Sequence, residues 1–261
     1  KYNVPLIDLQ KDKYKEYEIN GLKVNICDYA IKVDYLINIP VLKGHCQTNI
    51  TCALKNMKGC IPDTEKRRFH TLGLHKPIAY LNKLIKQDLI IVDGMNGDLN
   101  FEEGGNPVQM NRIIAGKDPV LIDTYAAQLL GFSIDEVPYI GIAQAIGVGS
   151  TDLANADIVE LNKDNGSKRI TQTRRVQQLA RQIVEDSACS ACYGSLIYAL
   201  ERLDEKGLLK KLEEKLYIGQ AFKNKQANGI GIGACTSGFH KNVRGCPPKA
   251  RDIVEYLESL I

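Results

Sequence analysis

The stretch A-G-K-D-P-V-L-I-D-T-Y-A-A-Q-L-L-G, residues 115–131, contains the pattern that decides the fold. The apolar run 113–115 leads into it and is typical of a buried strand. Asp118 and Pro119 then suit the N-cap and the first residue of a helix, and Gly131 suits its end. Between them, the apolar residues that share one helical face are Ile122, Tyr125, Ala126, Leu129 and Leu130. The stretch therefore predicts a strand followed by a helix that packs on a sheet.

The same alternation extends through the N-terminal part of the chain. Apolar runs that are typical of strands lie at residues 4–9, 22–27, 35–39 and 89–92. Ile78, Leu81 and Ile85 share one face of a predicted helix before the last of these runs. Strands that alternate with helices indicate the α/β class, with a sheet and flanking helices.

A polar, turn-rich segment at residues 162–168 is typical of a linker. We therefore predict an α/β domain over residues 1–165 and a smaller C-terminal α/β domain over residues 166–261. In the second domain, helical spacing is found at residues 176–183 and 193–203, and short strand-like runs at 216–219 and 230–232. A last helix is expected to open at Pro247 and Pro248.

Composition and charge argue against two classes of partner. Hydrophobic residues make up 44% and charged residues 25%, as in ordinary globular proteins, and the net charge of +3 is too small to indicate binding to nucleic acid or to a membrane surface. No apolar run approaches the roughly 18 residues of a membrane span. The sequence begins with Lys1 and shows no signal peptide. We expect a cytoplasmic protein, and a piece that lacks the N-terminal part of a longer one.

Four of the eight cysteines lie in motifs that point to a single metal centre. Cys189 and Cys192 form a C-x-x-C motif, Cys235 follows the strand-like run 230–232, and Cys246 stands in G-C-P-P. A 4Fe–4S cluster needs four thiolates that converge on one point. A C-x-x-C turn supplies two of them, and loops after neighbouring strands can supply the others. The cysteine pattern therefore predicts a 4Fe–4S cluster in the C-terminal domain.

Helix positions and glycines around these cysteines favour an anionic cluster. Cys192 stands at the start of one predicted helix, and Cys246 stands directly before the last one. The positive ends of both helices would face the cluster. Gly233 and Gly245 would let the backbone approach bulky inorganic sulfide.

Zinc is the main competing interpretation, because four thiolates also form structural zinc sites. Zinc ribbons usually pair two C-x-x-C turns, whereas the second pair here ends in Cys-Pro, a feature of iron–sulfur sequences. Free thiols or disulfides form a third interpretation. The remaining cysteines are predicted to be small buried hydrophobic residues, and they are Cys27, Cys46, Cys52 and Cys60. The alternative interpretation is a second metal site formed by His45, His70 and His75 with Cys46, Cys52 and Cys60.

The cysteine motifs resemble the proximal-cluster motif of the small subunit of nickel–iron hydrogenases and its counterpart in respiratory NADH dehydrogenase. A second resemblance covers nearly the whole chain. The chain looks like domain-of-unknown-function family 362, some members of which are iron–sulfur proteins. The matching stretches are residues 34–45, 51–59, 89–94, 101–108, 115–123 and the cysteine-bearing tail. This resemblance implies a fold and sometimes a cluster, and it implies a further segment before Lys1, but no established reaction.

Polar residues also gather after the predicted strand at 35–39. Ligands of α/β sheets bind beyond the carboxyl ends of strands, and we expect a helix from Thr48 to direct its N-terminus there. Lysines in such a crevice would bind an anion. The predicted ligand-binding residues are Lys43, His45, Thr51, Lys55, Asn56 and Asp93. The alternative interpretation is that the lysines are solvated and the threonines cap helices.

Taken together, these patterns favour a redox function. The cluster would pass single electrons to chemistry in the crevice, as in an oxidoreductase, or between partner proteins, as in an electron-transfer module. The expected partners are a redox protein or a small anionic ligand. The alternative is a non-redox enzyme or binding protein in which a cluster or zinc is structural.

Overall fold

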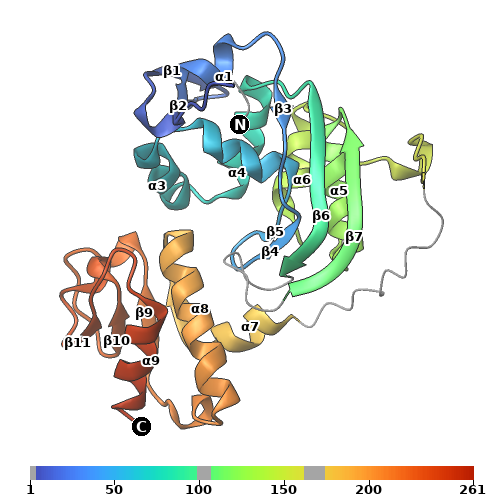
Figure 1. Cartoon of the computed structure of the whole chain (residues 1–261). Helices are drawn as coiled ribbons and strands as arrows, with labels where there is room; N and C mark the ends of the chain where they lie inside the picture. Colours follow the sequence, from blue (N-terminus) through green and yellow to red (C-terminus); the bar gives the residue numbers. More distant parts are fainter. Residues whose placement is uncertain (1–3, 99–106, 162–173) are drawn as a thin grey trace. The chain divides into compact units, whose positions relative to one another are not determined.

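The computed structural model describes residues 4–98, 107–161 and 174–261 (Figure 1), so the predicted linker lies outside the described residues. The chain divides into two compact units. The first unit comprises Lys1–Lys43, Ile50–Gly97 and Val108–Thr171. The second unit comprises Gly44–Asn49, Asp98–Pro107 and Gln172–Ile261. The second unit thus includes two short segments of the region that we assigned to the first domain.

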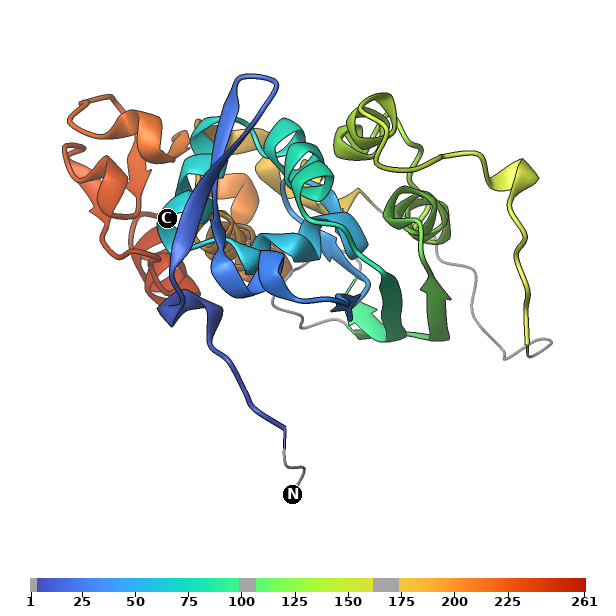
Figure 2. The same cartoon turned by 90° about the horizontal axis from the view of Figure 1, so that it is seen from above.

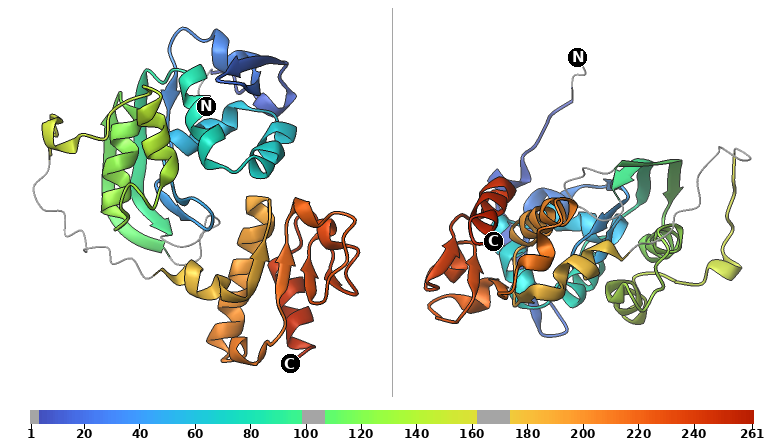
Figure 3. Two further views of the ribbon diagram at one scale, coloured as in Figure 1. Left: turned by 180° about the vertical axis from the view of Figure 1, so that it is seen from behind. Right: turned by 90° about the horizontal axis from the view of Figure 1, so that it is seen from below.

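The first unit is built on a three-stranded sheet with the order β3-β6-β7. Its strands are β3 (Ile37–Asn38), β6 (Leu89–Asp98) and β7 (Pro107–Gly116), and β3 runs parallel to β6. Helices α4 (His75–Leu84), α5 (Pro119–Leu129) and α6 (Pro138–Ala145) lie on one side of it (Figures 2 and 3). Ile90 and Val92 are buried, whereas Ile37, Ile39 and Ile113 are at least half exposed. The predicted strand followed by a helix is therefore β7 and α5.

The start of α5 confirms the cap that the sequence predicts. Asp118 Oδ1 accepts hydrogen bonds from the backbone N–H groups of Val120 (2.8 Å) and Leu121 (3.0 Å). Pro119 is the first helical residue, where its missing N–H group costs nothing. Asp118 Oδ2 also accepts from the backbone of Ser150, so one carboxylate fixes both the helix and a later loop.

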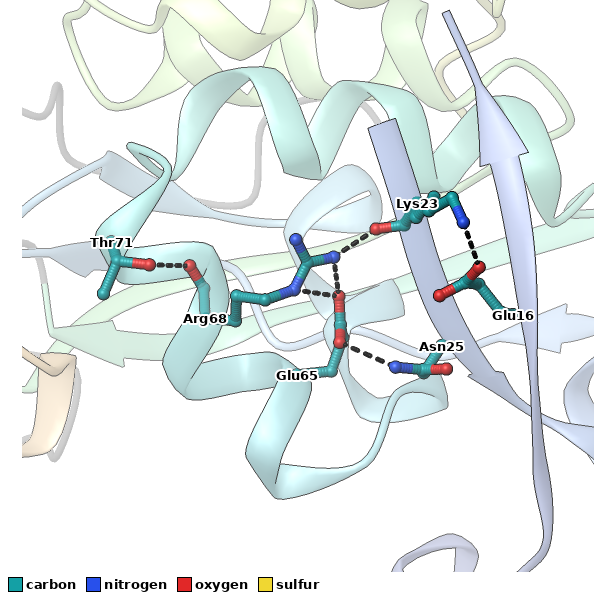
Figure 4. A network of polar contacts seen from close by, with 6 residues as sticks. All are labelled: Glu16, Lys23, Asn25, Glu65, Arg68 and Thr71. Carbon is teal, nitrogen blue, oxygen red and sulfur yellow. Dashed lines mark hydrogen bonds and ion pairs between the residues drawn. The ribbon is translucent and has the colours of Figure 1, made fainter. Parts of the chain in front are cut away.

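An antiparallel hairpin packs beside α3 (Asp63–Thr71) in the same unit (Figure 4). It consists of β1 (Tyr14–Ile19) and β2 (Leu22–Cys27). Glu65 of α3 is buried, accepts a hydrogen bond from Asn25 Nδ2 (3.2 Å) and pairs with Arg68. Arg68 in turn donates to the backbone carbonyl of Lys23. This polar network stabilises the hairpin against α3, because the buried carboxylate is fully engaged.

Some predicted elements of the first unit differ from the structure. Residues 4–9 are not a strand, because Leu6 is fully exposed and only the short 3-10 turn Leu9–Lys11 forms there. The remaining elements of this unit are α1 (Asp28–Lys32), α2 (Ala53–Asn56) and the 3-10 turns Met57–Cys60 and Leu153–Asn155. A separate two-stranded sheet of β4 (Lys43–His45) and β5 (Asn49–Thr51) precedes α2, and residues Gly44–Asn49 of it are counted with the second unit.

The second unit is a four-stranded parallel sheet with the order β11-β10-β9-β8. The strands are short: β8 (Ile183–Glu185), β9 (Leu216–Ile218), β10 (Ile230–Ile232) and β11 (Lys241–Val243). Helices α8 (Ser190–Glu205) and α9 (Ala250–Glu258) pack against each other and on the sheet (Figure 1). Leu196, Leu200 and Ile253 are completely buried and belong to one core with the inward residues of β9 and β10. The unit confirms the predicted smaller α/β domain.

Two helix boundaries of the second unit correct our predictions. Residues 176–183 are not one helix, because α7 (Arg175–Leu179) gives way to the 3-10 turn Ala180–Gln182 and Ile183 pairs with Leu216 in the sheet. The last helix begins at Ala250 instead of Pro247, since its first hydrogen bond runs from Ile253 N–H to the Lys249 carbonyl. Further 3-10 turns lie at Leu209–Lys211, Gln220–Phe222 and Ala234–Thr236. Within the described ranges, no helix is both long and apolar enough to cross a membrane.

Candidate functional site

The topology of the second unit explains why the four predicted ligands can meet. Because all four strands run parallel, the loops after them emerge at one edge of the sheet. The loop after β8 leads to Cys189, which is the N-cap of α8, and Cys192 lies in the first turn of that helix. Cys235 lies in the 3-10 turn directly after β10, and Cys246 follows β11. The sheet therefore delivers three cysteine-bearing segments to the same edge.

The sulfur atoms of these residues act on one another electrostatically. Burial raises the pKa of the Cys192 thiol to about 12, with further upward contributions from Cys189, Cys246 and Cys235. Each of the other three thiols is thus close enough to disfavour a thiolate at Cys192. Cys192 therefore stays a thiol at neutral pH unless a positive charge lies beside it.

Two glycines allow the cysteine loops to approach closely. Gly233 has φ 93°, and a Cβ there would lie 3.5 Å from the Gly245 carbonyl oxygen and 4.0 Å from Cys192 Sγ. Gly245 has φ 140°, and its Cβ would lie 2.4 Å from Pro248 Cα. A hydrogen bond of 2.8 Å from Ala234 N–H to the Gly245 carbonyl then ties the two loops together. Both positions have a positive φ that favours glycine, and at Gly245 a Cβ would also clash with Pro248, whereas the predicted approach to inorganic sulfide stays a prediction.

The helix positions agree only partly with the predicted electrostatics. The N-terminus of α8 lies at Cys189, so its free N–H groups face the cysteine segment. Residues 247–249 separate Cys246 from the first residue of α9, so Cys246 does not stand directly before that helix. The positive end of the α8 dipole therefore lies at the cysteines as predicted. The dipole of α9 has a weaker effect on Cys246, because a helix dipole acts mainly within the first turn of the helix.

Gln220 is a polar neighbour of the cysteines that the sequence did not reveal. It stands in the loop after β9, and its Nε2 atom donates to Cys189 Sγ at 3.7 Å and to the Ser187 carbonyl at 3.4 Å. No cysteine motif marks this position. The only available signal was its place directly after a short strand of the parallel sheet.

Gln47 is a second residue that sequence reasoning missed. Its Nε2 atom donates to the Ala188 carbonyl (2.9 Å), and its Oε1 atom accepts from Ser190 Oγ (2.9 Å). His45 Nδ1 accepts from the backbone N–H groups of Gln47 (3.0 Å) and Thr48 (3.2 Å), which shapes the loop that presents Gln47. Gln47 thereby forms hydrogen bonds with the residues directly before and directly after Cys189.

The spacing of the thiols differs from that of a single-ion site. All eight cysteines are free thiols. Across the described parts of the chain, no three His, Cys, Asp or Glu side chains are arranged to hold one metal ion. In a zinc site, all sulfur atoms lie about 2.3 Å from one ion, whereas each thiolate of a 4Fe–4S cluster binds a different iron. The choice between zinc and a 4Fe–4S cluster at these cysteines therefore stays a prediction.

The other cysteines have different surroundings. Cys27 and Cys52 are completely buried, as predicted for packing residues, whereas Cys46 and Cys60 are half-buried. Burial raises the pKa of Cys60 to about 11 and that of Cys52 well above its ordinary value. Cys46 packs against the core of the second unit. Burial also raises the pKa of Cys27, so Cys27, Cys52 and Cys60 stay protonated at neutral pH, which suits side chains that fill space.

The polar residues of the first unit form a different arrangement from the predicted helix at Thr48. Residues Asn49–Thr51 form a strand, and the helix begins only at Ala53. The cause is Asp123, whose carboxylate accepts from the backbone N–H groups of Ala53 (2.7 Å) and Leu54 (3.3 Å). Burial raises the pKa of Asp123 to about 7. A distant carboxylate therefore sets the start of α2, which local sequence could not indicate.

Some of the predicted ligand-binding residues lie close together. Lys55 is buried, and its Nζ atom donates to Thr51 Oγ1 at 3.1 Å. Asn56 Nδ2 donates to Asn38 Oδ1 (2.7 Å), and Asn38 in turn donates to the Ala53 carbonyl. These contacts join the short helix α2 to strand β3 through a buried polar network.

The other predicted ligand-binding residues are not shown to share that cluster. Lys43 is half-buried at the start of β4. Asp93 is exposed on β6, where its Oδ1 atom accepts from Met95 N–H and its backbone pairs with Leu42. His45 belongs to the second unit. The shared anion site therefore stays a prediction.

A groove of about 1140 Å³ lies elsewhere in the first unit. It is lined by β7, by the start of α5 and by residues 153–161, and includes Arg112, Lys117 and Tyr125. None of the six predicted ligand-binding residues lines it. The groove and the buried Lys55 cluster are therefore separate features of this unit.

Comparison with known proteins identifies the N-terminal part of the chain. Residues 1–128 match the model of a domain of unknown function, DUF362. The first 128 residues are a DUF362 domain. The resemblance to this family is therefore confirmed over that range, which contains α2 and Asp123 and ends before the cysteine motifs.

A curated relative is the "Thylakoid-associated protein sll1697" of Synechocystis sp. (strain ATCC 27184 / PCC 6803 / Kazusa). It is 24% identical over 156 residues, which are 57% of this chain and 49% of the relative. The chain thus matches about half the length of that protein. No solved structure matches significantly. The resemblance of the cysteine motifs to hydrogenase small subunits stays a prediction.

Proposed function

We propose that the second unit binds a 4Fe–4S cluster through Cys189, Cys192, Cys235 and Cys246 and passes single electrons. The observation that carries this proposal is the meeting of three cysteine-bearing segments at the carboxyl edge of one parallel sheet. The electrostatic influence of the other three thiols on Cys192 supports it. When bound, the cluster would supply a centre that accepts or donates one electron.

The residues around the cysteines suit this group. Gly233 and Gly245 let the loops that carry Cys235 and Cys246 pack closely against each other. The N-terminus of α8 and the Gln220 amide both direct N–H groups toward the cysteine segment, as expected around an anionic cluster. Cys246 is exposed, so one side of the cluster would lie near the protein surface.

For the first unit, we propose that the buried Lys55 ammonium group and the Thr51 hydroxyl group contribute to binding a small anion. An oxidoreductase would need both sites, whereas an electron-transfer module would need only the cysteine centre.

The decisive experiment is anaerobic purification with iron, sulfide and zinc analysis. We expect a brown protein with broad absorption at about 400 nm and about four irons per chain. Cys189→Ser and Cys246→Ser should each remove most of the iron, whereas the matched substitution Cys60→Ser should retain it, because Cys60 belongs to the first unit.

Two results would contradict the proposal. A colourless protein with one zinc per chain would assign the cysteines to a structural zinc site. Loss of iron on Cys60→Ser, with retention on Cys246→Ser, would mean that the division of the eight cysteines is wrong. Electron paramagnetic resonance of the reduced protein distinguishes a redox-active cluster from a structural one, since only the former gains an unpaired electron on mild reduction.

A further inference from the structure

The charge distribution around the last two cysteines is one-sided. Residues 215–251 contain no Asp or Glu. The basic residues in this stretch are Lys215, Lys223, Lys225, Lys241, Arg244, Lys249 and Arg251. The whole chain, in contrast, is nearly balanced, with 34 Lys and Arg against 31 Asp and Glu. The positive charge is thus a local property of the segment that carries Cys235 and Cys246.

Three of these cations are engaged elsewhere in the second unit. Lys241 pairs with Glu214, and Arg251 lies 3.5 Å from Glu255. Lys215 Nζ donates to the Arg181 carbonyl at 3.2 Å. Their charges are partly compensated and contribute less to the potential outside the protein.

The other four cations, Lys223, Lys225, Arg244 and Lys249, form what we call the cationic rim. All four are exposed, and among the residues that the structure describes none of them forms an ion pair with a carboxylate. Lys225 Nζ lies 5.9 Å from the centre of the Phe222 ring, which restricts its side chain without neutralising it.

The cationic rim lies close along the chain to Cys246 and to Gln220. Arg244 and Lys249 stand two residues before and three residues after Cys246, which is itself exposed. Lys223 follows Gln220 by three residues, and Gln220 contacts Cys189 Sγ. Since a chain spans at most about 3.6 Å per residue, the backbones of Lys223, Arg244 and Lys249 lie within about 11 Å of Gln220 or Cys246, and that of Lys225 within about 18 Å of Gln220.

We propose that the cationic rim docks a small acidic electron-carrier protein and that one electron passes between that carrier and the cluster at Cys246. This inference rests on the proposed cluster. In the transfer, the reduced carrier loses one electron and the oxidised cluster gains it, with no bond formed or broken. Complementary charge raises association rates by about 10 to 1000-fold at low salt, which suits a transient contact. Electron-transfer contacts are also among the smallest specific interfaces, so a rim of four cations is adequate.

The test uses the full chain with its cluster and a strongly acidic plant-type ferredoxin as the probe. Stopped-flow absorbance measures the rate at which the reduced ferredoxin reduces the cluster. The variant Arg244→Glu with Lys249→Glu should slow this rate at least tenfold at about 0.01 M salt, and the difference should vanish near 1 M salt because the Debye length falls from about 30 Å to about 3 Å.

The matched control is Lys210→Glu with Lys211→Glu. These exposed residues follow the opposite end of α8, about 24 Å from Cys189 along a helix of 16 residues. The control should leave the rate within twofold of the original. A basic cytochrome c as electron acceptor should show the reverse order, with the rim variant faster than the original protein.

The outcomes separate this inference from the proposed cluster. Protein that never holds iron overturns the proposed function. Protein that keeps its iron and its visible spectrum but reacts equally fast with and without the rim substitutions overturns the docking inference alone. Salt-dependent binding of duplex DNA that the rim variant abolishes, with an unchanged ferredoxin rate, would reassign the rim to nucleic acid.

Discussion

In the second unit, the four candidate cysteines lie on segments that follow parallel strands, whereas in the first unit Lys55 and Asn56 lie on a four-residue helix. The arrangement in the second unit needs only parallel strands, because the carboxyl ends of parallel strands lie at one edge of the sheet. The arrangement in the first unit needs Asp123, which lies seventy residues away from Ala53 in the chain and fixes the start of α2. A site is therefore easier to predict from sequence when the direction of the strands alone brings its residues together.

The same difference appears in the electrostatics. Around the cysteines, the other thiols disfavour ionisation of Cys192, and residues 215–251, which carry Cys235 and Cys246, contain basic but no acidic residues. Around α2, the polar side chains form hydrogen bonds with one another: Asn38 donates to Gln87, and Gln87 donates to Asn82. The basic residues near Cys235 and Cys246 would favour the anionic cluster that we propose, whereas the network around α2 mainly holds its own backbone.

The largest expected effect belongs to the backbone of the cysteine loops. Gly245→Ala should abolish cluster binding, because its φ of 140° is strained for alanine and its Cβ would lie 2.4 Å from Pro248 Cα. Gly207→Ala, at φ 69° with open space around its Cβ, is the matched control and should cost about 1 kcal/mol with iron retained. Iron per chain and the denaturation midpoint measure both. Equal iron content in the two variants would mean that this loop does not shape the site.

The next effect tests whether the first unit depends on its distant carboxylate. Asp123→Ala should reduce the free energy of unfolding by about 2–4 kcal/mol, because two buried backbone N–H groups lose their acceptor. Asp123→Asn keeps an acceptor oxygen and should lose less. Urea denaturation of each variant measures the difference. Neither variant should change the iron content, and a loss of iron would show that the two units are not independent in this respect.

Asp123 also predicts a pH dependence of stability. Its folded-state pKa of about 7 lies above the ordinary value of 3.8, so the folded state holds a proton that the unfolded state releases between these values. The stabilising contribution is therefore complete below about pH 4 and is lost as the pH rises through about 7. Asp123→Asn should flatten this part of the stability profile. A profile that the substitution leaves unchanged would contradict the assignment to Asp123.

Sequence reasoning succeeded where periodicity and local caps determine the structure. The helices α5 and α8 and the strands β2, β9 and β10 follow from apolar spacing and from Asp118, all of which are local signals. The break after Leu179 could not be predicted in this way, because Ile183 leaves the helical pattern to pair with Leu216. The start of α2 escaped prediction for the same reason, since it depends on a contact with Asp123.

The candidate site shows the same limit. The cysteines were recognisable because C-x-x-C and G-C-P-P have meaning as motifs. Gln47 and Gln220 were not, because an isolated glutamine has no such signature, and only the folded chain brings them to Ala188 and Cys189. Hydrogen bonds between distant residues carry information that a single sequence does not display.

A smaller effect tests the anion site of the first unit. Lys55→Met removes the buried ammonium group beside Thr51 and should abolish the rise in denaturation temperature that inorganic phosphate is expected to cause. Lys76→Met, an exposed lysine at the start of α4, is the matched control and should respond as the original protein does. Equal stabilisation of the Lys55 variant and the original by phosphate would remove Lys55 from the site.

The smallest expected effect concerns Gln220, the residue that joins the loop after β9 to the cysteines. Its amide N–H group donates to Cys189 Sγ, and such bonds stabilise the more negative, reduced cluster. A hydrogen bond worth about 0.5–1.5 kcal/mol corresponds to roughly 20–60 mV for one electron. Gln220→Ala should therefore lower the reduction potential by that amount, with iron content unchanged, whereas the exposed control Gln226→Ala should not shift it. Spectroelectrochemical titration of the three proteins measures the shift. An unchanged potential in Gln220→Ala would show that the glutamine only supports the loop through Ser187, and the comparison between units would then rest on the cysteines and glycines alone.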